Sequence, residues 1–516
     1  MGAILENILI GLREVAAFDI IGMIFLGVLI GSVFGLIPGL TATMAVAVLS
    51  PLTLTLDPLL AIPFLIGVYR GGLWGGVVTA VLLGVPGTAA NVPTLLDGHP
   101  LARKGYPQTA MRSALYGSVI GAVFASLLLF TLVGPVASAA LEIGSPELFG
   151  LMFFSLTLVS FLSGRHIAKG WLAAGLGLGV SMIGVDPIIG TPRFTFGVSE
   201  LLGGVEIIPM VIGLFAISEI ALQIEARLMK DHGVALVRSA DIERQPDDHI
   251  KWRTVIRRYW RTILQASATG AFIGVLPGIG SETSPWISYT IAKRTSKRGA
   301  NFGKGEPEGV VATEVSNDAV VGAAFIPLLV FGIPGDLPLA VMLGAFLAQG
   351  LRPGPSLFRD QPEVMYGIVA AVLVSSLALY VLGRLTISTF ARVLDTPKWV
   401  LYPAILVISI AGAFANENTV FDVYVMAFFG IVGYLFRRTG VPLAPFILAF
   451  VLGPRVEQAF RESLLLDTSI GVFFSSPLSS ALVIAALLVL VLSPIGRNRL
   501  AGAEALSDVE PISDVE

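Results

Sequence analysis

Cysteine is absent from this chain of 516 residues, and charged residues are scarce. Without cysteine, the chain can form neither a disulfide nor a thiolate metal site. Asp, Glu, Lys and Arg make up 13% of the sequence, about half the share that is usual in soluble proteins. The basic residues form no stripe of the kind that binds nucleic acid, so we expect no nucleic-acid partner. The four histidines are scattered and predict no metal site.

The motifs of common enzyme and nucleotide-binding classes are missing as well. The chain has no Ser/His/Asp order, no H-E-x-x-H, and no glycine-rich segment followed by the Lys-Ser/Thr of a phosphate-binding loop. These absences argue against ATP-driven transport and predict a protein that is not an enzyme, with no catalytic residue and no organic cofactor. Two alternatives to a transporter stay open. One is a membrane-embedded enzyme that uses Glu282 or Asp318 as acid or base, and the other is a channel.

Apolar residues dominate what is present. They make up 55% of the chain, and the mean hydropathy is +0.84. Continuous apolar runs long enough to cross a bilayer core of ~30 Å recur along the sequence. This pattern predicts an all-α polytopic membrane protein with about 10–12 transmembrane segments in the lipid bilayer.

Four Gly-hydrophobic-Pro-Gly motifs interrupt the apolar runs, at Pro38-Gly39, Pro86-Gly87, Pro277-Gly278 and Pro334-Gly335. Proline has no N–H to donate, and glycine favours non-helical angles, so each motif breaks a helix. Backbone groups freed inside hydrocarbon must be buried in protein or line a polar cavity. Half-helix ends that face a cavity at mid-membrane can bind an anion or a coupling cation. A single such motif would instead favour a simple kink or an interfacial loop.

The order of the motifs predicts an internal repeat, with one pair in residues 18–112 and the other in 262–360. These cores belong to a first membrane half, 18–224, and a second, 262–496. The segment 263–292 has arms of about 14 residues, too short to span, and basic flanks on both sides, which predict a re-entrant hairpin entering from the cytoplasm. The sparse flanks of the first break suit the opposite face. We therefore predict two inverted repeats with re-entrant or broken helices.

Three further segments complete the predicted organisation. Residues 1–17 are expected to form an interfacial helix, 225–261 a polar cytoplasmic connector, and 497–516 a polar C-terminal tail. The basic end of the connector favours a topology determinant over a lipid- or nucleotide-binding site.

Polar residues beside the breaks are the candidates for binding. A carboxylate at membrane depth is costly unless it is paired, so we predict that Glu282, Glu314 and Asp318 bind a coupling Na⁺ or H⁺, with Na⁺ near Asn317 and Asp318. Alternatively, Glu314 and Asp318 cap a solvated helix end. Arg70 either binds a substrate carboxylate or forms a structural ion pair with Glu282 or Asp318. The candidate binding residues are Pro38, Gly39, Thr41, Thr43, Arg70, Pro86, Gly87, Thr88, Asn91, Pro277, Gly278, Gly280, Ser281, Glu282, Thr283, Glu314, Ser316, Asn317, Asp318, Pro334, Gly335 and Asp336.

These motifs in combination resemble those of one transporter family. The stretches that carry the likeness are Gly35-Leu-Ile-Pro-Gly-Leu, Leu49-Ser-Pro-Leu-Thr53, Val85-Pro-Gly-Thr-Ala-Ala90, Leu96-Asp-Gly-His-Pro-Leu-Ala-Arg-Lys-Gly105 and Gln349-Gly-Leu-Arg-Pro-Gly-Pro355. The chain resembles the large membrane subunit (TctA family) of tripartite tricarboxylate transporters, and the likeness spans most of its length.

The resemblance implies a secondary active transporter subunit that imports a tricarboxylate or dicarboxylate across a bacterial inner membrane, coupled to Na⁺ or H⁺. It also implies two partners, a small membrane subunit (TctB-like) and a periplasmic solute-binding protein (TctC-like) that delivers the carboxylate. The chain departs from the family pattern at Asp318, where a second Asn is usual, and at Glu282, where small residues are usual. These additional carboxylates favour a role for H⁺.

Overall fold

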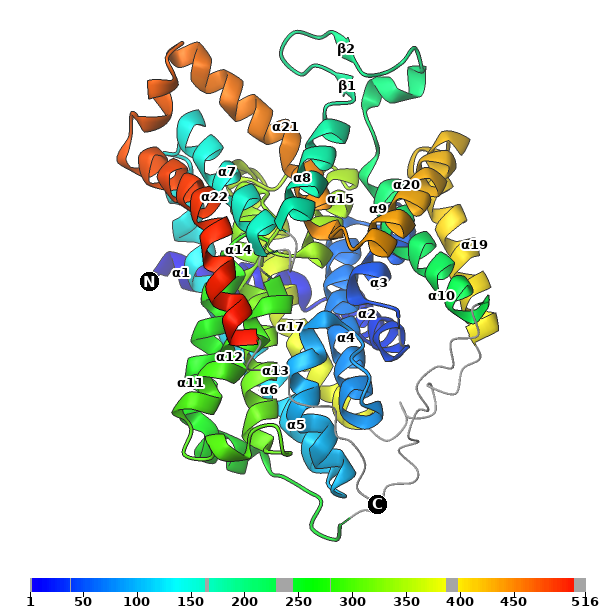
Figure 1. The fold of residues 1–516 in the computed structure, drawn as a ribbon, viewed down its shortest axis with the longest axis vertical. Coiled ribbons are helices and arrows are strands. Elements are labelled where there is room, and N and C mark those ends of the chain that lie inside the picture. Colours follow the sequence, from blue (N-terminus) through cyan, green and yellow to red (C-terminus); the bar gives the residue numbers. More distant parts are fainter. Residues whose placement is uncertain are drawn as a thin grey trace.

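The computed structural model describes residues 2–37, 39–162, 167–228, 245–278, 280–386 and 398–504. Pro38, residues 229–244 of the predicted connector and residues 505–516 of the predicted tail lie outside this part. The described chain is almost entirely helical (Figure 1). Its α-helices are α1 (Gly2–Val15), α2 (Phe18–Leu36), α3 (Ala42–Leu49), α4 (Pro58–Leu83), α5 (Val92–Arg103), α6 (Pro107–Ala140), α7 (Ser145–Leu162), α8 (Ile167–Ser181), α9 (Ile207–Ile212), α10 (Ser218–Leu228), α11 (Trp252–Val275), α12 (Gly280–Thr295), α13 (Pro307–Ala323), α14 (Phe325–Phe331), α15 (Leu337–Ala348), α16 (Pro355–Asp360), α17 (Pro362–Thr386), α19 (Lys398–Glu417), α20 (Val420–Thr439), α21 (Leu443–Leu466) and α22 (Pro477–Glu504).

The prediction of an all-α polytopic membrane protein is confirmed. Within the described residues, eight helices are long and apolar enough to cross a membrane, and six apolar helices are shorter. The prediction of about 10–12 transmembrane segments lies between the eight long helices and the fourteen obtained when the six shorter ones are added. One long span, 207–225, contains a π-helical turn, Gly213–Ile217, between α9 and α10.

The two halves follow the same order of elements around their breaks. In each half, a helix is followed by a Pro-Gly break and then by a shorter helix. These helices are α2 and α3 in the first half, and α11 and α12 in the second. A longer helical segment follows and ends in a second break. That segment is α4 in the first half and α13 with α14 in the second. Both segments end at a left-handed glycine, Gly84 with φ 70° and Gly332 with φ 63°. This matched geometry supports the predicted repeat, and its inverted orientation in the membrane stays a prediction.

Glycines bring α2 and α4 into backbone contact. A Cβ atom added to Gly31 would lie 2.1 Å from the carbonyl oxygen of Val68, and one added to Gly71 would lie 2.1 Å from that of Val28. Small residues at the interface are what allow membrane helices to approach this closely. Arg70, one residue from Gly71, therefore projects from a helix that is held against its neighbour by backbone contact.

We expect Gly31→Ala to destabilise the protein, because the added methyl group meets a carbonyl oxygen that cannot move without separating two helices. The cost of such overpacking is about 1–3 kcal/mol or more. Thermal unfolding of the purified protein measures it. Gly22→Ala is the matched control, because no atom lies within 4 Å of a Cβ at that position of the same helix. Equal melting temperatures of the two variants would contradict the predicted contact.

The second half begins with helical turns that were not predicted. Helix α11 begins at Trp252 and is kinked at Tyr259, where the backbone angles are not helical. The turns before the kink form because the basic stretch is amphipathic, since Val255 and Tyr259 are buried between exposed arginines. After the kink, α11 continues to Val275 over about the length predicted for an arm, and α12, with 16 residues or ~24 Å, is shorter than a bilayer core. The re-entrant hairpin and the connector boundary at 261 stay predictions.

Both ends of the chain are helical where they are described. Helix α1 occupies most of the predicted interfacial segment and packs on α17, where the side-chain amide of Asn7 donates a hydrogen bond to the hydroxyl of Tyr366 over 2.7 Å. Its position relative to a membrane surface stays a prediction. At the other end, α22 extends to Glu504, so the first residues of the predicted tail continue a helix.

A short hairpin protrudes at one end of the molecule (Figure 1). Strands β1 (Gly184–Val185) and β2 (Pro192–Arg193) pair antiparallel, with Gly184 opposite Arg193. Asp186 accepts hydrogen bonds from the backbone N–H groups of Ile189 and Ile188, and its carboxylate also pairs with Arg461 at 2.7 Å. These partners lower the pKa of Asp186 to about 2, so the carboxylate is charged over the physiological pH range.

Candidate functional site

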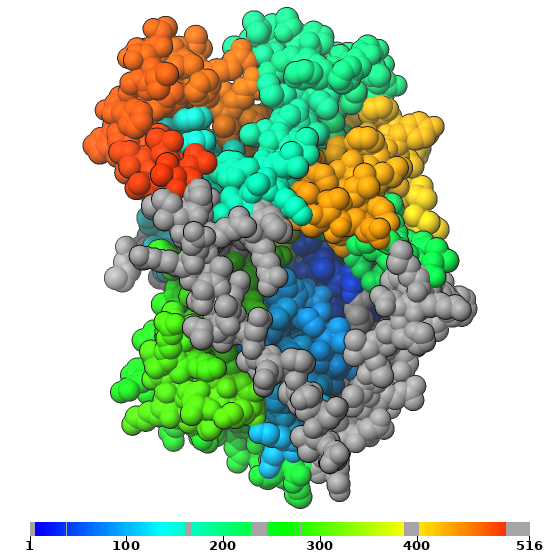
Figure 2. Space-filling view, in the orientation of Figure 1, coloured from blue at the N-terminus to red at the C-terminus, as the bar shows by residue number. Residues whose placement is uncertain are grey.

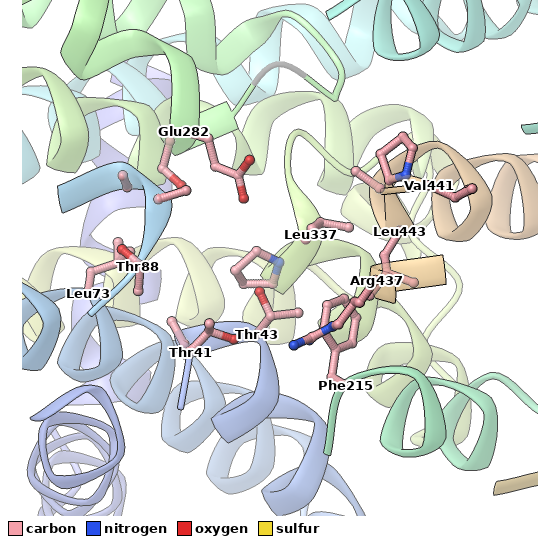
Figure 3. Close-up of a pocket in the computed structure, with 17 residues that line it drawn as sticks. Thr41, Thr43, Leu73, Thr88, Phe215, Glu282, Leu337, Arg437, Val441 and Leu443 are labelled. Carbon is pink, nitrogen blue, oxygen red and sulfur yellow. The ribbon is translucent and has the colours of Figure 1, made fainter. Parts of the chain in front are cut away.

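The four breaks converge on one cavity of about 370 Å³ (Figure 3). The residues that follow each break line it, namely Thr41, Ala42, Thr43, Thr88, Ala89, Ala90, Ser281, Glu282, Leu337 and Pro338. Later segments complete the wall with Phe215, Arg437, Val441, Pro442, Leu443 and Ala444, and α4 adds Leu73. Segments that are hundreds of residues apart in the sequence thus form one site, and both halves of the chain contribute to it.

Several helices begin at this cavity. Residues in the first turns of α3, α12, α15 and α21 are all part of its wall. Thr41 caps α3 by accepting a hydrogen bond from the N–H of Met44 over 3.2 Å, and Asp336 caps α15 by accepting one from the N–H of Leu339 over 3.1 Å. The N-terminal end of a helix carries a partial positive charge. The wall therefore favours an anion from several directions.

Two charged side chains face the cavity. Glu282 is exposed to it and makes no hydrogen bond or ion pair with any residue in the described part of the chain. Arg437 lies across the cavity, and both side chains point into the same space in Figure 3. Arg437 also pairs with Glu219, which in turn accepts a hydrogen bond from Gln223 over 2.9 Å. Glu282 is thus the carboxylate of the cavity without a neutralising partner.

The third and fourth breaks are bonded to each other beside the cavity. The N–H of Gly278 donates a hydrogen bond to the carbonyl oxygen of Gly335 over 2.9 Å. A small adjoining cavity of about 30 Å³ is lined by Gly278, Gly280, Glu282 and Asp336, among others. Gly280 has φ 54°, and a Cβ there would lie 2.5 Å from that of Asp336. Glycine is required at this position by both the backbone angle and the space.

The second break packs closely against α4 and the end of α2, beside the first break. Gly87 packs on α4, where an added Cβ would lie 2.4 Å from the Cα of Gly76, and 2.8 Å from the carbonyl oxygen of Gly35. Thr88 donates a hydrogen bond to the side-chain oxygen of Asn91 over 2.6 Å. The amide nitrogen of Asn91 is buried and has no hydrogen-bond partner among the described residues. This nitrogen is a donor that a bound group or a water molecule would satisfy.

Arg70 and Asp318 form a buried ion pair away from the cavity. Arg70 is completely buried, its Nη1 lies 2.8 Å from Oδ1 of Asp318, and its Nε donates a hydrogen bond to Ser375 over 2.9 Å. The sequence left Glu282 and Asp318 as possible partners of Arg70, and the structure places Asp318 beside it. The Nη2 atom of Arg70 is the one nitrogen of its guanidinium group that lacks a partner within the described chain.

The remaining candidates on α13 belong to a polar layer behind the cavity. Glu314 is buried and accepts hydrogen bonds from Thr94 and, over 3.1 Å, from Ser118. The hydroxyls of Ser316 and Ser284 share a hydrogen bond of 2.6 Å. The side-chain amide of Asn317 is buried, and neither its oxygen nor its nitrogen has a partner in the part of the chain that the structure describes. Such an unsatisfied amide is a candidate to bind an ion or a water molecule.

The structure therefore divides the predicted site residues into groups. Thr41, Thr43, Thr88, Ser281 and Glu282 line the main cavity. Gly278, Gly280 and Asp336 line the small one, and Asp336 also accepts a hydrogen bond from Tyr69. Those that line neither cavity are Gly39, Arg70, Pro86, Gly87, Asn91, Pro277, Thr283, Glu314, Ser316, Asn317, Asp318, Pro334 and Gly335. Their roles in binding stay predictions. No three His, Cys, Asp or Glu side chains of the described ranges gather as metal ligands do.

Sequence reasoning missed the wall that the π-helical turn after α9, the end of α20 and the start of α21 supply. Arg437 lies in the last turn of α20, where a basic residue is equally well explained as an anchor for the end of a membrane span. Phe215 lies in the π-helical turn, and such turns often mark functional sites. The available signal was Glu219, a carboxylate inside an apolar run, which requires a partner somewhere in the fold.

Comparisons with known proteins agree with the resemblance seen in the motifs. The family described as "Tripartite tricarboxylate transporter TctA family" matches residues 21–448. The "Uncharacterized 52.8 kDa protein in TAR-I ttuC' 3'region" of Agrobacterium vitis is 34% identical over 472 residues, which cover 91% of this chain and 92% of the relative. The "Uncharacterized protein in TAR-II ttuC' 3'region" of the same organism is 37% identical over 214 residues, 41% of this chain and 88% of the relative. No solved structure matches the chain significantly.

Proposed function

Because the chain belongs to the tripartite tricarboxylate transporter TctA family, we propose that it carries an organic anion with two or three carboxylates across a bacterial inner membrane. In this proposal the inward flow of Na⁺ or H⁺ drives import. A periplasmic solute-binding protein delivers the anion, and a small membrane subunit completes the complex. The coarser conclusion, that the chain is a multi-pass membrane protein of a transporter family, already follows from the family match and the apolar helices.

The observation that supports the proposal is the convergence of all four breaks on one cavity. Helix starts and Arg437 supply positive charge for the carboxylates of the cargo, and the threonine and serine hydroxyls supply hydrogen bonds. Glu282 and the unsatisfied amide of Asn317 supply oxygen atoms for Na⁺, and Glu282 is also a site for H⁺. A cavity of about 370 Å³ is in the range of small-molecule sites.

Broken helices that meet at a cavity from two repeats are typical of transporters that work by alternating access. We propose that the broken helices move as a unit against the remaining helices and carry the cavity from one face to the other. An elevator-like stroke is one form of this movement. Structures in inward- and outward-facing states without displacement of residues 274–284 along the membrane normal would rule the stroke out.

The test is uptake by proteoliposomes that contain the chain, the small membrane subunit and the solute-binding protein. We expect saturable accumulation of a labelled carboxylate that requires the binding protein and an inward Na⁺ or H⁺ gradient. Chemical turnover of the carboxylate in detergent would instead favour the membrane-embedded enzyme. Uptake that neither saturates nor depends on the binding protein would favour a channel.

A cavity-filling variant links this activity to the site. Ala89 is exposed within the cavity, so Ala89→Trp should occupy the space of the cargo and reduce uptake to about a tenth or less. Ala300→Trp is the matched control, because Ala300 is also exposed in a short 3₁₀ turn but lies outside the cavity. Normal uptake by Ala89→Trp would contradict the assignment of the cavity.

A further inference from the structure

A second, larger cavity of about 440 Å³ lies where the start of α11 meets the end of α12, outside the site described above. Four basic side chains line it, namely Arg258, Arg261, Lys297 and Arg298, together with one carboxylate, Glu308. The helices of this hairpin form part of the molecular surface in the lower half of the molecule (green in Figure 2). This cavity is therefore a basic pocket at the periphery of the protein.

The carboxylates at the pocket pair with only one of the four cations, Arg298. Glu308 is buried and accepts hydrogen bonds from Thr262 over 2.6 Å, Ser296 over 2.8 Å and Nε of Arg298 over 3.1 Å. Among the described residues, no carboxylate lies within 4.0 Å of the charged nitrogens of Arg258, Arg261 or Lys297. A second carboxylate, Glu306, lies 3.7 Å from Nε of Arg298. The pocket thus keeps a surplus of positive charge beyond these two carboxylates.

Aromatic rings hold these cations in place. The guanidinium groups of Arg258 and Arg298 lie 5.9 and 5.0 Å from the centre of the ring of Tyr259, which is buried. The guanidinium of Arg261 lies 5.3 Å from that of Trp260. Cation–π contacts of this kind fix the position of an arginine without neutralising its charge. The arginines are thus oriented for an external anion.

An exposed apolar stripe begins at the same pocket. Trp260, Leu264 and Phe272 are 55, 58 and 67% exposed, and together with the exposed Ala268 they form a row of every fourth residue that winds slowly around α11. The stripe is ~18 Å long from Trp260 to Phe272. Positive charge at one end of such a stripe matches a molecule with an anionic head and a long apolar tail.

We propose that the basic pocket binds the phosphate of an anionic phospholipid, with an acyl chain along the apolar stripe of α11. The lipid would join the first turns of α11 to the end of α12 and so tie together the two ends of the hairpin that carries the third break. Free phosphate offers the same charge, but it leaves the stripe unexplained, and the stripe therefore favours the lipid. The basic end of the predicted connector is then a binding site as well as a topology determinant.

The test uses the full-length protein in a neutral detergent, titrated with phosphatidylglycerol or phosphatidylcholine, with binding followed by native mass spectrometry. We expect preferential binding of phosphatidylglycerol. Since each basic residue near an anionic lipid contributes about a fivefold factor in affinity, Arg258→Gln/Lys297→Gln should weaken this binding about 25-fold, and Lys297→Gln alone about fivefold. Arg253→Gln/Lys293→Gln is the matched control, because both residues are exposed on the same two helices outside the pocket.

The outcomes separate the lipid from its alternatives. Loss of binding in the pocket variants with retention in the control supports the site, provided that the variants elute like the unaltered protein in size exclusion. An equal loss in the control would show a general surface attraction and overturn the proposal. Binding of inorganic phosphate that depends on Arg258 and Lys297, without binding of phosphatidylglycerol, would assign the pocket to a soluble anion. None of these results depends on the transported substrate.

Discussion

Arg70→Gln is expected to remove most of the folded protein. Arg70 and Asp318 are buried together with a nitrogen–oxygen distance of 2.8 Å, and their side chains are 0 and 4% exposed. Removal of one partner leaves the other as a buried charge, which costs about 3–5 kcal/mol. A loss of this size is comparable with the whole stability of many proteins. We therefore expect a large drop in the amount of monodisperse protein after detergent extraction and a lower melting temperature.

The double variant Arg70→Gln/Asp318→Asn identifies the cause. It removes both charges and keeps side chains of similar size, so it should recover much of the folded protein that the single variant loses. Arg359→Gln is the control for loss of an arginine from an ion pair, because Arg359 and Asp360 are 73 and 56% exposed and such pairs contribute little. A double variant as unstable as Arg70→Gln would show that the arginine acts through contacts other than Asp318.

The places where helices begin and end could be predicted from the sequence, because each depends on the types of a few neighbouring residues. Pro58 after Asp57 begins α4, Gly84 ends it, and the hydrogen bond from the N–H of Leu59 to Asp57 over 2.8 Å is the expected cap. The four Pro-Gly motifs likewise stand in non-helical backbone wherever they are described. These features depend on a few neighbouring residues and need no knowledge of tertiary contacts.

The start of α11 was missed although the sequence contained a signal. Arginines obscure a spacing of four, three and four residues between the buried residues Val255, Tyr259, Thr262 and Ala266. A hydrophobicity average falls below the membrane range over such a segment, whereas the periodicity of its buried face still indicates a helix. A periodicity count would therefore have found this helix.

The partners across the fold could not be derived from local patterns. Arg70 is 248 residues from Asp318, and the sequence left Glu282 and Asp318 as equal choices for its ion pair. Arg437 reaches the cavity only because α20 packs on the π-helical turn of the first half, where Gly430 and Gly213 allow a close approach. Which end of an apolar helix faces a cavity depends on such packing, and a charge at a helix end is explained equally well by membrane topology.

Glu282→Gln is expected to abolish accumulation against a gradient while preserving exchange. The prediction depends on the proposed transport function. Glu282 faces the cavity and has no neutralising partner among the described residues. An unneutralised carboxylate at membrane depth costs about 2.5–3.5 kcal/mol, so the empty carrier should cross slowly until Na⁺ or H⁺ neutralises it. This penalty couples the ion to the cargo, and a neutral glutamine removes it.

Proteoliposome assays measure both parts of this prediction. In Glu282→Gln, the accumulation ratio under an inward gradient should fall by about tenfold or more, because the carrier now crosses without its ion. Exchange of labelled against unlabelled carboxylate at equal ion concentrations should continue, since that movement needs no net ion flow. Glu142→Gln, which changes an exposed carboxylate in the connection after α6, is the control.

The ion dependence of uptake tests the same role of Glu282. The unaltered protein should depend either on pH or on Na⁺. This dependence should disappear in Glu282→Gln, because glutamine can neither bind a proton nor neutralise Na⁺. Accumulation by Glu282→Gln that still follows the ion gradient would place the coupling site elsewhere, with the buried carboxylates of α13 as the next candidates.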